Sequence, residues 1–427
     1  MVEDREPKEK IDPKIIVALI SGFVSILTAM IPILSDTERN RFLASAAFLF
    51  GFALAGVCVF ILFRRRIYWG IGVLALLLAG IGVANYFSRQ VVSEPQSLAY
   101  ANTTVSVYAG TGERAFLDGP FEESAFVSPA RMSVHQDSVY VTDSDRIRRL
   151  ENGKVTTEAF PSSRFNALAV RNLESDLYVL AENRQMESGG YYNFFVRIRN
   201  GESEVVSEPF ELGVFSASVS DFAFSNGGVL YFIRLYNVPG KSTATLEKLS
   251  HDRDADRYGP PEWVMDFSYE ASDMQDARMT FDADDNLYIS VPAQGVILRM
   301  GHEEQEARVF AGIPGEQAFN DQGRCTFSYP TALLTENGLL YVLDNGVVRR
   351  IVVDGDKAVS CDTLAGVTPE VLHSGRINIR SVGVGESVAG VDCAIPADER
   401  ASLALDNRGT LLLTDPVNSL IYQIWEN

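Results

Sequence analysis

Two kinds of hydrophobic pattern divide the chain. The first 87 residues contain three uninterrupted apolar runs, at residues 15–34, 42–63 and 67–87, and none of them contains Asp, Glu, Lys, Arg or His. The runs are 20, 22 and 21 residues long. At about 1.5 Å of rise per residue, a helix of this length spans roughly 30 Å, the thickness of the hydrocarbon core of a bilayer. We therefore expect three transmembrane helices with these bounds.

The basic residues around these runs predict their orientation. Seven lie on one side, namely Arg5, Lys8, Lys10, Lys14, Arg64, Arg65 and Arg66, whereas the other side has only Arg39, Arg41 and Arg89. By the positive-inside rule, residues 1–14 form a cytoplasmic tail, and the chain after Phe87 lies outside the cytoplasm. The expected location is thus the cytoplasmic membrane, in a multi-pass arrangement with the bilayer as a partner.

The predicted helices lack the ionisable side chains that line ion paths, so we expect an anchor or an assembly surface. Ala47, Gly51 and Ala55 form a row of small residues that permits close helix approach. This row allows two interpretations: packing among the chain's own helices, or contact with a membrane-protein partner.

Beyond a polar linker at residues 88–102, the pattern changes to short stretches of β-forming residues separated by turns. One stretch recurs six times, usually as Leu-Tyr or Val-Tyr between apolar residues. The six lie at residues 139–141, 177–179, 230–232, 287–289, 340–342 and 411–413. Each is preceded by one strand candidate and followed by one or two more. Four short strands per unit predict an all-β propeller with six blades over residues 103–427.

Two of the units carry a longer motif. Its elements are Val107 to Gly112, Phe116 to Gly119, Ser128-Pro129, Val139 to Asp143 and Arg146 to Arg148 in the first unit, and Phe310 to Gly312, Gly315, Tyr329-Pro330 and Leu340 to Asp344 in the fifth. These segments resemble the NHL repeat, whose members form propellers. In that repeat the Ala-Gly segment ends the fourth strand of a blade. The resemblance therefore implies that residues 103–110 complete the last blade and close the ring.

The longest connections predict a binding surface. In a four-stranded antiparallel blade, the second-to-third and fourth-to-next-first connections lie on the same face. Five insertions are assigned to this insertion face: residues 112–127, 182–193, 235–243, 315–328 and 367–396. A sixth insertion, at residues 250–261, is expected on the opposite face. Because long loops often carry function, the candidate binding residues are Phe116, Asp118, Tyr191, Tyr192, Phe319 and Asp321. For the Phe and Asp pairs, a role in shaping the loops is the alternative.

Charge narrows the range of partners. The chain has a formal net charge of −19. By count, residues 88–427 carry 28 Lys+Arg against 49 Asp+Glu. A domain this acidic excludes nucleic acid, which requires a basic surface.

The cysteines and histidines of the sequence allow a disulfide but do not favour a zinc site. Cys325, Cys361 and Cys393 lie in the outer domain, where one pair could oxidise, and the sequence leaves all three pairings open. Some relatives of NHL-type propellers are zinc-dependent lyases that use converging histidines. Here only His135, His251, His302 and His373 occur, and the first three are expected on the face opposite the insertions.

No catalytic, cofactor or metal residue is therefore predicted, and an enzyme is less favoured than a binding protein. The expected function is a non-catalytic, membrane-anchored binding or scaffold module for a protein or glycan partner, with a place in a membrane complex as one form of it. An extracytoplasmic metal-dependent lyase or hydrolase with a site at the channel is the alternative.

Overall fold

The computed structural model describes residues 102–426 apart from 159–164, 184–191, 209, 212–216, 239–240, 322–324 and 369–380. The three predicted transmembrane segments and the linker lie outside these ranges. Among the described residues, no helix is both long and apolar enough to cross a bilayer.

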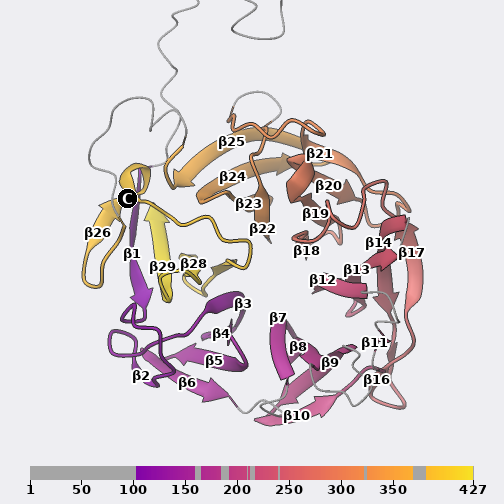
Figure 1. Cartoon of the computed structure of the whole chain (residues 1–427), viewed down its shortest axis with the longest axis horizontal. Coiled ribbons are helices and arrows are strands. Elements are labelled where there is room, and N and C mark those ends of the chain that lie inside the picture. Colours follow the sequence, from indigo (N-terminus) through magenta and orange to yellow (C-terminus); the bar gives the residue numbers. More distant parts are fainter. Residues whose placement is uncertain are drawn as a thin grey trace, which may run out of the picture. The chain divides into compact units, whose positions relative to one another are not determined.

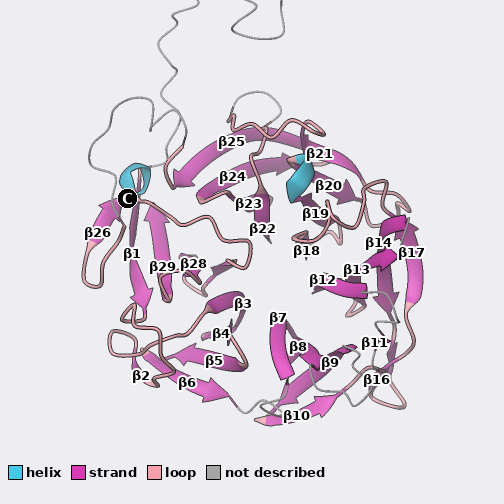
Figure 2. Cartoon of the chain, in the orientation of Figure 1, coloured by secondary structure: helices cyan, strands magenta, loops and turns pink. Residues whose placement is uncertain are grey.

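The described part of the chain is an all-β propeller of six blades, which confirms the predicted fold class (Figures 1 and 2). The first two blades are β3 (Pro129–His135), β4 (Ser138–Asp143), β5 (Arg146–Glu151) and β6 (Lys154–Glu158), then β7 (Phe165–Leu173), β8 (Asp176–Asn183), β9 (Tyr192–Arg199) and β10 (Glu202–Val205). Two short strands are added to them: β2 (Gly119–Pro120) pairs with β6, and β11 (Phe210–Glu211) pairs with β9.

The next three blades are each a single antiparallel sheet of four strands. The third comprises β12 (Ala217–Phe224), β13 (Leu230–Val238), β14 (Lys241–Leu249) and β17 (Glu262–Asp266), and the fourth comprises β18 (Met279–Phe281), β19 (Leu287–Val291), β20 (Val296–Met300) and β21 (Arg308–Gly312). The fifth comprises β22 (Pro330–Glu336), β23 (Leu339–Asp344), β24 (Val347–Asp354) and β25 (Lys357–Ala365). A 3₁₀ turn, η1 (Pro292–Gln294), follows β19.

The sixth blade joins the two ends of the domain. It contains β27 (Leu403–Leu405), β28 (Leu411–Asp415) and β29 (Leu420–Glu426), followed outward by β1 (Thr103–Ala109) and β26 (Ser387–Ala389), and a second 3₁₀ turn, η2 (Gly390–Asp392), follows β26. β1 is antiparallel to β29, with Thr103 opposite Glu426 and Val107 opposite Tyr422. Figure 1 shows the indigo β1 lying between the yellow β29 and β26. The predicted ring closure by residues 103–110 is thus confirmed.

Apolar residues fill the spaces between neighbouring blades. The described residues form six buried clusters, one at each blade-to-blade boundary. Both faces of a blade pack against a neighbour, so consecutive residues of a strand are buried, as all five residues of β19 and of β28 are. At the seam, Val105 is fully buried in the cluster shared by the fifth and sixth blades.

The recurring Ala-Gly segment has a steric cause. Gly312 and Gly366 follow a buried Ala at the end of the fourth strand and have φ of +89° and +106°. A Cβ on either glycine would lie 2.3 Å from a carbonyl oxygen in the second-to-third turn of the same blade. Only glycine combines this φ with so close an approach.

The insertions differ in part from expectation. β13 continues to Val238 and β14 begins at Lys241, so the predicted insertion at 235–243 is wrong: most of it is strand, stabilised by backbone pairing from Val238–Lys241 through Leu235–Ala244. The segment at 250–261 connects the third and fourth strands of its blade and contains a small hairpin, β15 (His251–Asp252) with β16 (Arg257–Tyr258). Its Asp256 accepts two hydrogen bonds of 2.8 Å from Arg197 of the second blade, which lower the pKa of Asp256 to about 2.

A substitution in β1 tests how much ring closure stabilises the domain. We call the pairing of β1 with β29 the seam. We expect Val105→Asp to lower the free energy of unfolding by about 4 kcal/mol or more, because it places an unpaired carboxylate in a sealed core. The control is Val359→Asp on β25, where the valine is 60% exposed; it should change stability by less than about 0.5 kcal/mol. Denaturant unfolding of the purified protein measures both. If the two variants lost equal amounts of stability, the pairing of β1 with β29 would stabilise the domain no more than the exposed outer strand of a blade does.

Candidate functional site

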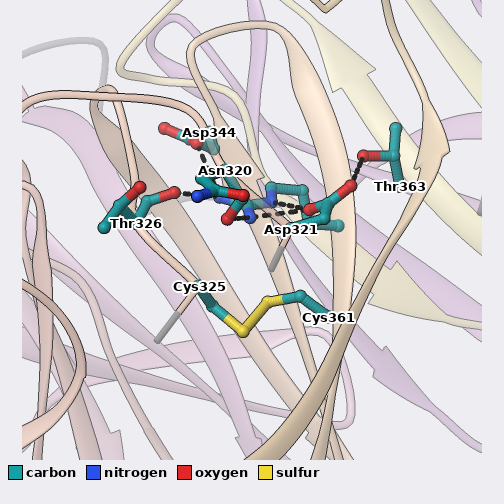
Figure 3. Close-up of a disulfide and its surroundings, with 8 residues drawn as sticks. Asn320, Asp321, Cys325, Thr326, Asp344, Cys361 and Thr363 are labelled. Atoms are coloured by element: carbon teal, nitrogen blue, oxygen red, sulfur yellow. Dashed lines mark hydrogen bonds and ion pairs between the residues drawn. A yellow bond between two sulfur atoms is a disulfide. The ribbon is translucent and has the colours of Figure 1, made fainter. Parts of the chain in front are cut away.

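Two of the predicted binding residues, Asp118 and Asp321, hold loops of the insertion face in place. Asp118 accepts hydrogen bonds from Arg148, at 2.8 Å, and from the backbone N–H and hydroxyl of Thr157. Asp321 binds Arg349, at 2.7 Å, and the hydroxyl of Thr363. Figure 3 shows Asp321 pointing toward Thr363. Their partners favour the loop-shaping role that the sequence left as the alternative.

The partner arginines, Arg148 and Arg349, are fully buried at corresponding positions of the first and fifth blades. Each donates to two loop carbonyls and bridges two aspartates, Asp118 and Asp143 or Asp321 and Asp344. We call each set a latch: Asp118–Arg148–Asp143 and Asp321–Arg349–Asp344. Burial raises the pKa of Asp143 and of Asp344, although the paired arginines oppose the rise. Removing one partner of a buried ion pair leaves an uncompensated charge in the interior, so each latch holds its loop against the blade.

The two phenylalanines have different surroundings. Phe319 lies under the guanidinium of Arg349, at 4.5 Å from ring centroid to Cζ. Phe116 instead stacks with the half-exposed Arg146, at 3.8 Å, and is 36% exposed, and its neighbour Leu117 is 51% exposed. Of the two loops with this Phe-x-Asp pattern, the one in the first blade therefore exposes two apolar side chains, Phe116 and Leu117.

The predicted binding roles of Tyr191 and Tyr192 stay predictions. Tyr192 is the first residue of β9, and Tyr191 lies outside the described residues. The structure thus brings Phe116 close to Asp118 and Phe319 close to Asp321, within separate blades.

A disulfide links Cys325 to Cys361 and leaves Cys393 as a buried free thiol (Figure 3). It ties the loop at 315–328, which carries Asp321, to the outer strand β25. Burial raises the pKa of Cys393 to about 12, so this thiol is unreactive at neutral pH.

The sequence did not reveal a cluster of charged residues near the axis of the ring, to which every blade contributes. We define this axial cluster as Arg131, Arg171, Asp221, Asp276, Arg278, Tyr329, Asp398 and Glu399. Most lie at or before the start of an inner strand, on the same face as the predicted insertions. The members are joined by the hydrogen bonds and mutual charge effects described below.

Two buried arginines of the axial cluster brace the segment that precedes β27. Arg131 donates to the carbonyls of residues 399, 400 and 401, at 3.1–3.4 Å. Arg278, from the fourth blade, donates to the Glu399 carbonyl at 2.8 Å. Burial lowers the pKa of Arg131 to about 10, although the nearby Asp221 opposes this shift. Asp221 is fully buried and accepts hydrogen bonds from Arg171 and from the Met279 backbone N–H.

The axial cluster also contains a carboxyl–phenol pair and a second carboxylate. The Tyr329 hydroxyl donates to Asp276 at 2.9 Å. Burial raises the pKa of Asp276, a rise that the Glu399 charge increases and the Tyr329 hydrogen bond opposes. Burial, together with Asp276 and Glu399, raises the pKa of Tyr329 to about 12. Asp276 and Tyr329 are half-buried and Glu399 is exposed, so this part of the cluster can meet a ligand.

The three histidines that the structure describes do not converge on the axis. His135 ends β3, His251 lies in β15 near Asp256, and His302 follows β20 with its Nδ1 3.8 Å from Asp285. His373 lies outside the described residues. Within the described ranges, no group of three or more His, Cys, Asp or Glu side chains could hold a metal ion.

Comparisons with known proteins show similarity of fold. No protein-family model matches the chain, and no curated protein matches it. Among solved structures, it is similar to an auxiliary nutrient binding protein from Bacteroides thetaiotaomicron, with a TM-score of 0.53 and 15% identity over 77% of each chain. A protein of the same description from Bacteroides ovatus has a TM-score of 0.53 and 16% identity, over 76% of this chain and 77% of the other.

The latches can be tested by comparing the two aspartates. We expect Asp321→Ala to lower the free energy of unfolding by about 3–5 kcal/mol, because it removes one partner of a buried arginine. Asp321 is 7% exposed and Asp118 is 49% exposed, so Asp118→Ala should cost clearly less, about 1–2 kcal/mol. Chemical denaturation measures both variants. If neither changes stability, the aspartates do not hold the loops and a role in binding regains support.

Proposed function

We propose that the protein is a membrane-anchored, extracytoplasmic, NHL-like propeller that acts as a non-catalytic binding module. Its partner, a protein or a glycan, is bound on the insertion face, and the apolar runs at 15–34, 42–63 and 67–87 anchor it in the cytoplasmic membrane. In this proposal the chain supplies recognition and leaves any signal to a membrane partner that contacts its helices.

The observation that carries this proposal is the composition of the insertion face. The half-buried Asp276 and Tyr329 and the exposed Glu399 lie there, and the exposed pair Phe116 and Leu117 belongs to a loop of the same face. Binding surfaces combine exposed apolar residues with a few fixed polar groups. The latches and the disulfide hold the loops before any partner arrives, which reduces the entropy lost on binding.

Two further observations support the proposal. A disulfide between Cys325 and Cys361 fits an oxidising compartment outside the cytoplasm. The two similar solved structures are described as nutrient-binding, so a propeller of this architecture has a precedent in binding.

An extracytoplasmic hydrolase or lyase is the second candidate function. It is favoured by Asp276, whose raised pKa and hydrogen bond to Tyr329 are properties of catalytic acids. Stoichiometric zinc in the purified protein, or a partner recovered in cleaved form, would favour this function over simple binding.

The compartment can be tested by counting thiols. Protein denatured from native membranes without reductant should react with two maleimide–polyethylene glycol molecules, at Cys58 and Cys393, because Cys325 and Cys361 are joined. After reduction all four cysteines of the chain should react. A gel shift resolves the two states. Four reactive thiols before reduction would place the domain in a reducing compartment and contradict the proposed topology.

Partner capture can be tested with matched surface variants. We expect the intact protein, purified in mild detergent, to retain a stoichiometric partner that mass spectrometry identifies. Leu117→Glu should abolish retention, because it places a charge in the apolar part of the insertion face. Val359→Glu should not, since Val359 is 60% exposed on the outer strand of the fifth blade.

A chimera in which residues 1–87 are replaced by an unrelated anchor separates recognition by the helices from recognition by the propeller. Loss of the partner only in this chimera would place recognition on the helices. Recovery of no stoichiometric protein or glycan would contradict the proposed module.

A further inference from the structure

The outer strand of the third blade exposes an aromatic side chain on an uncovered sheet edge. β17 pairs with β14 on one side and with no other strand among the described residues, and Figure 1 shows it on the outer rim of the ring. Its Trp263 is 65% exposed, the highest fraction of any large hydrophobic side chain that the structure describes. An unpaired edge offers backbone N–H and C=O groups to an incoming strand.

The outer edges of three other blades are already covered, and they show that this fold accepts added strands. β26 is a fifth strand on β1 of the sixth blade, and the short β2 is a fifth strand on β6 of the first. In the second blade, Val206 follows the outer strand β10 and accepts a backbone hydrogen bond of 2.8 Å from Tyr258 of the β15–β16 hairpin. Within the described ranges, β17, β21 and β25 are the outer strands that no further strand covers.

Charge distinguishes β17 from the other two uncovered strands. Exposed carboxylates lie at its two ends, Glu262 and Asp266, and the strand contains no basic residue. By contrast, β21 and β25 begin with exposed basic residues, Arg308 and Lys357. The edge of β17 therefore matches a basic segment, and the acidic domain around it favours the approach of such a partner.

Local contacts prepare Trp263 for a cationic side chain. Its indole Nε1 donates to Asp266 at 3.0 Å, which restrains the ring next to a carboxylate. On its other side, Glu262 contacts Lys248 at 3.6 Å, and half of the Glu262 side chain remains exposed. An exposed indole flanked by carboxylates attracts an arginine or a lysine through both cation–π contact and charge. Tryptophan and arginine are also the residues most often found at the centres of interfaces.

A second copy of this strand is a poor occupant of the edge. If two β17 strands paired antiparallel around Val264, Glu262 of one copy would lie opposite Asp266 of the other. Like charges directly opposite each other destabilise a strand pair. The carboxylates that repel a second β17 attract lysine and arginine, so the edge selects a basic chain.

We propose that β17 is a docking edge for an extended, basic segment of a protein partner, which joins the third blade as a fifth strand. The backbone of this segment pairs with the edge of β17, as in other cases of strand addition. One of its basic side chains stacks on Trp263, and others lie beside Glu262 and Asp266. This docking edge is on the outer wall of the ring and uses no residue of the insertion face, so the inference does not rest on the proposed function.

Fluorescence polarisation with labelled peptides and the full chain in detergent tests the docking edge. The probe is amidated Arg-Val-Arg-Thr-Arg-Val with the label at its N-terminus. A second peptide has the same side chains and an N-methyl group on every backbone nitrogen, which removes the donors of a strand, and a third has Glu in place of Arg. The probe should bind with a dissociation constant below about 1 mM. The other two should bind about tenfold more weakly or not at all, because one cannot form the ladder and the other carries the wrong charge.

Variants of the chain locate the binding. Trp263→Ala should weaken binding of the probe about tenfold or more, as expected for the anchor of an interface. Glu262→Gln combined with Asp266→Asn should weaken it about threefold, because both carboxylates are exposed. The control is Val309→Ala on the uncovered strand β21, where the valine is 43% exposed, and it should leave the affinity unchanged. All four positions are at the surface, and thermal unfolding verifies that the variants are folded.

The inference is overturned if the probe shows no saturable binding or if Trp263→Ala leaves its affinity unchanged. Equal binding of the N-methylated peptide would also overturn it, because charge would then attract the peptide without strand pairing. Equal binding of the Glu peptide would show that the edge does not select a basic chain.

Discussion

The pairing of β1 with β29 is the interaction on which the rest of the domain depends. It joins residues that are more than 300 positions apart in the chain and converts a row of blades into a ring. Each blade buries apolar residues against two neighbours, so an open ring would expose both the Val105 cluster and the cluster at the boundary with the first blade. The axial cluster depends on closure as well. Arg131 of the first blade donates to carbonyls that precede β27 of the sixth blade, and ring closure makes these two blades neighbours.

The buried arginines show how the fold positions its loops. Arg148 and Arg349 each donate to carbonyl groups of a long connection whose backbone also pairs with itself. The latches are not identical: the Nε of Arg349 donates to Asp321, whereas the Nε of Arg148 has no acceptor among the described residues. The loop of the fifth blade also has the disulfide, so it is the more firmly held of the two. The first-blade loop, with its exposed phenylalanine and leucine, is better placed to adjust to a partner.

The sequence predicted the fold well because the signals of a propeller are local. The Leu-Tyr strands, the turns and the Ala-Gly segments recur in each unit or in several, and the glycines have a steric reason that is independent of the ligand. The axial cluster could not be predicted in the same way. Asp276, Tyr329 and Glu399 lie in three connections, of which only the one with Tyr329 belongs to the recognised motif, and the packing of consecutive blades brings them together. Arg148 and Arg349 occupy strand positions, where an arginine gives no sign of complete burial. The error at 235–243 arose because polar residues on a strand were interpreted as a loop.

The seam also determines how the domain would respond to mechanical force. Thr103 and Glu426 are directly opposite each other, so tension that enters through the chain before Thr103 acts on the first pair of the seam. β1 is held on both sides, by β29 and by β26. Tension along the strand would shear both ladders at once, while tension across it would open them one pair at a time, at a much lower force. The direction of pull would then decide whether the ring stays closed, and with it whether the axial cluster remains assembled.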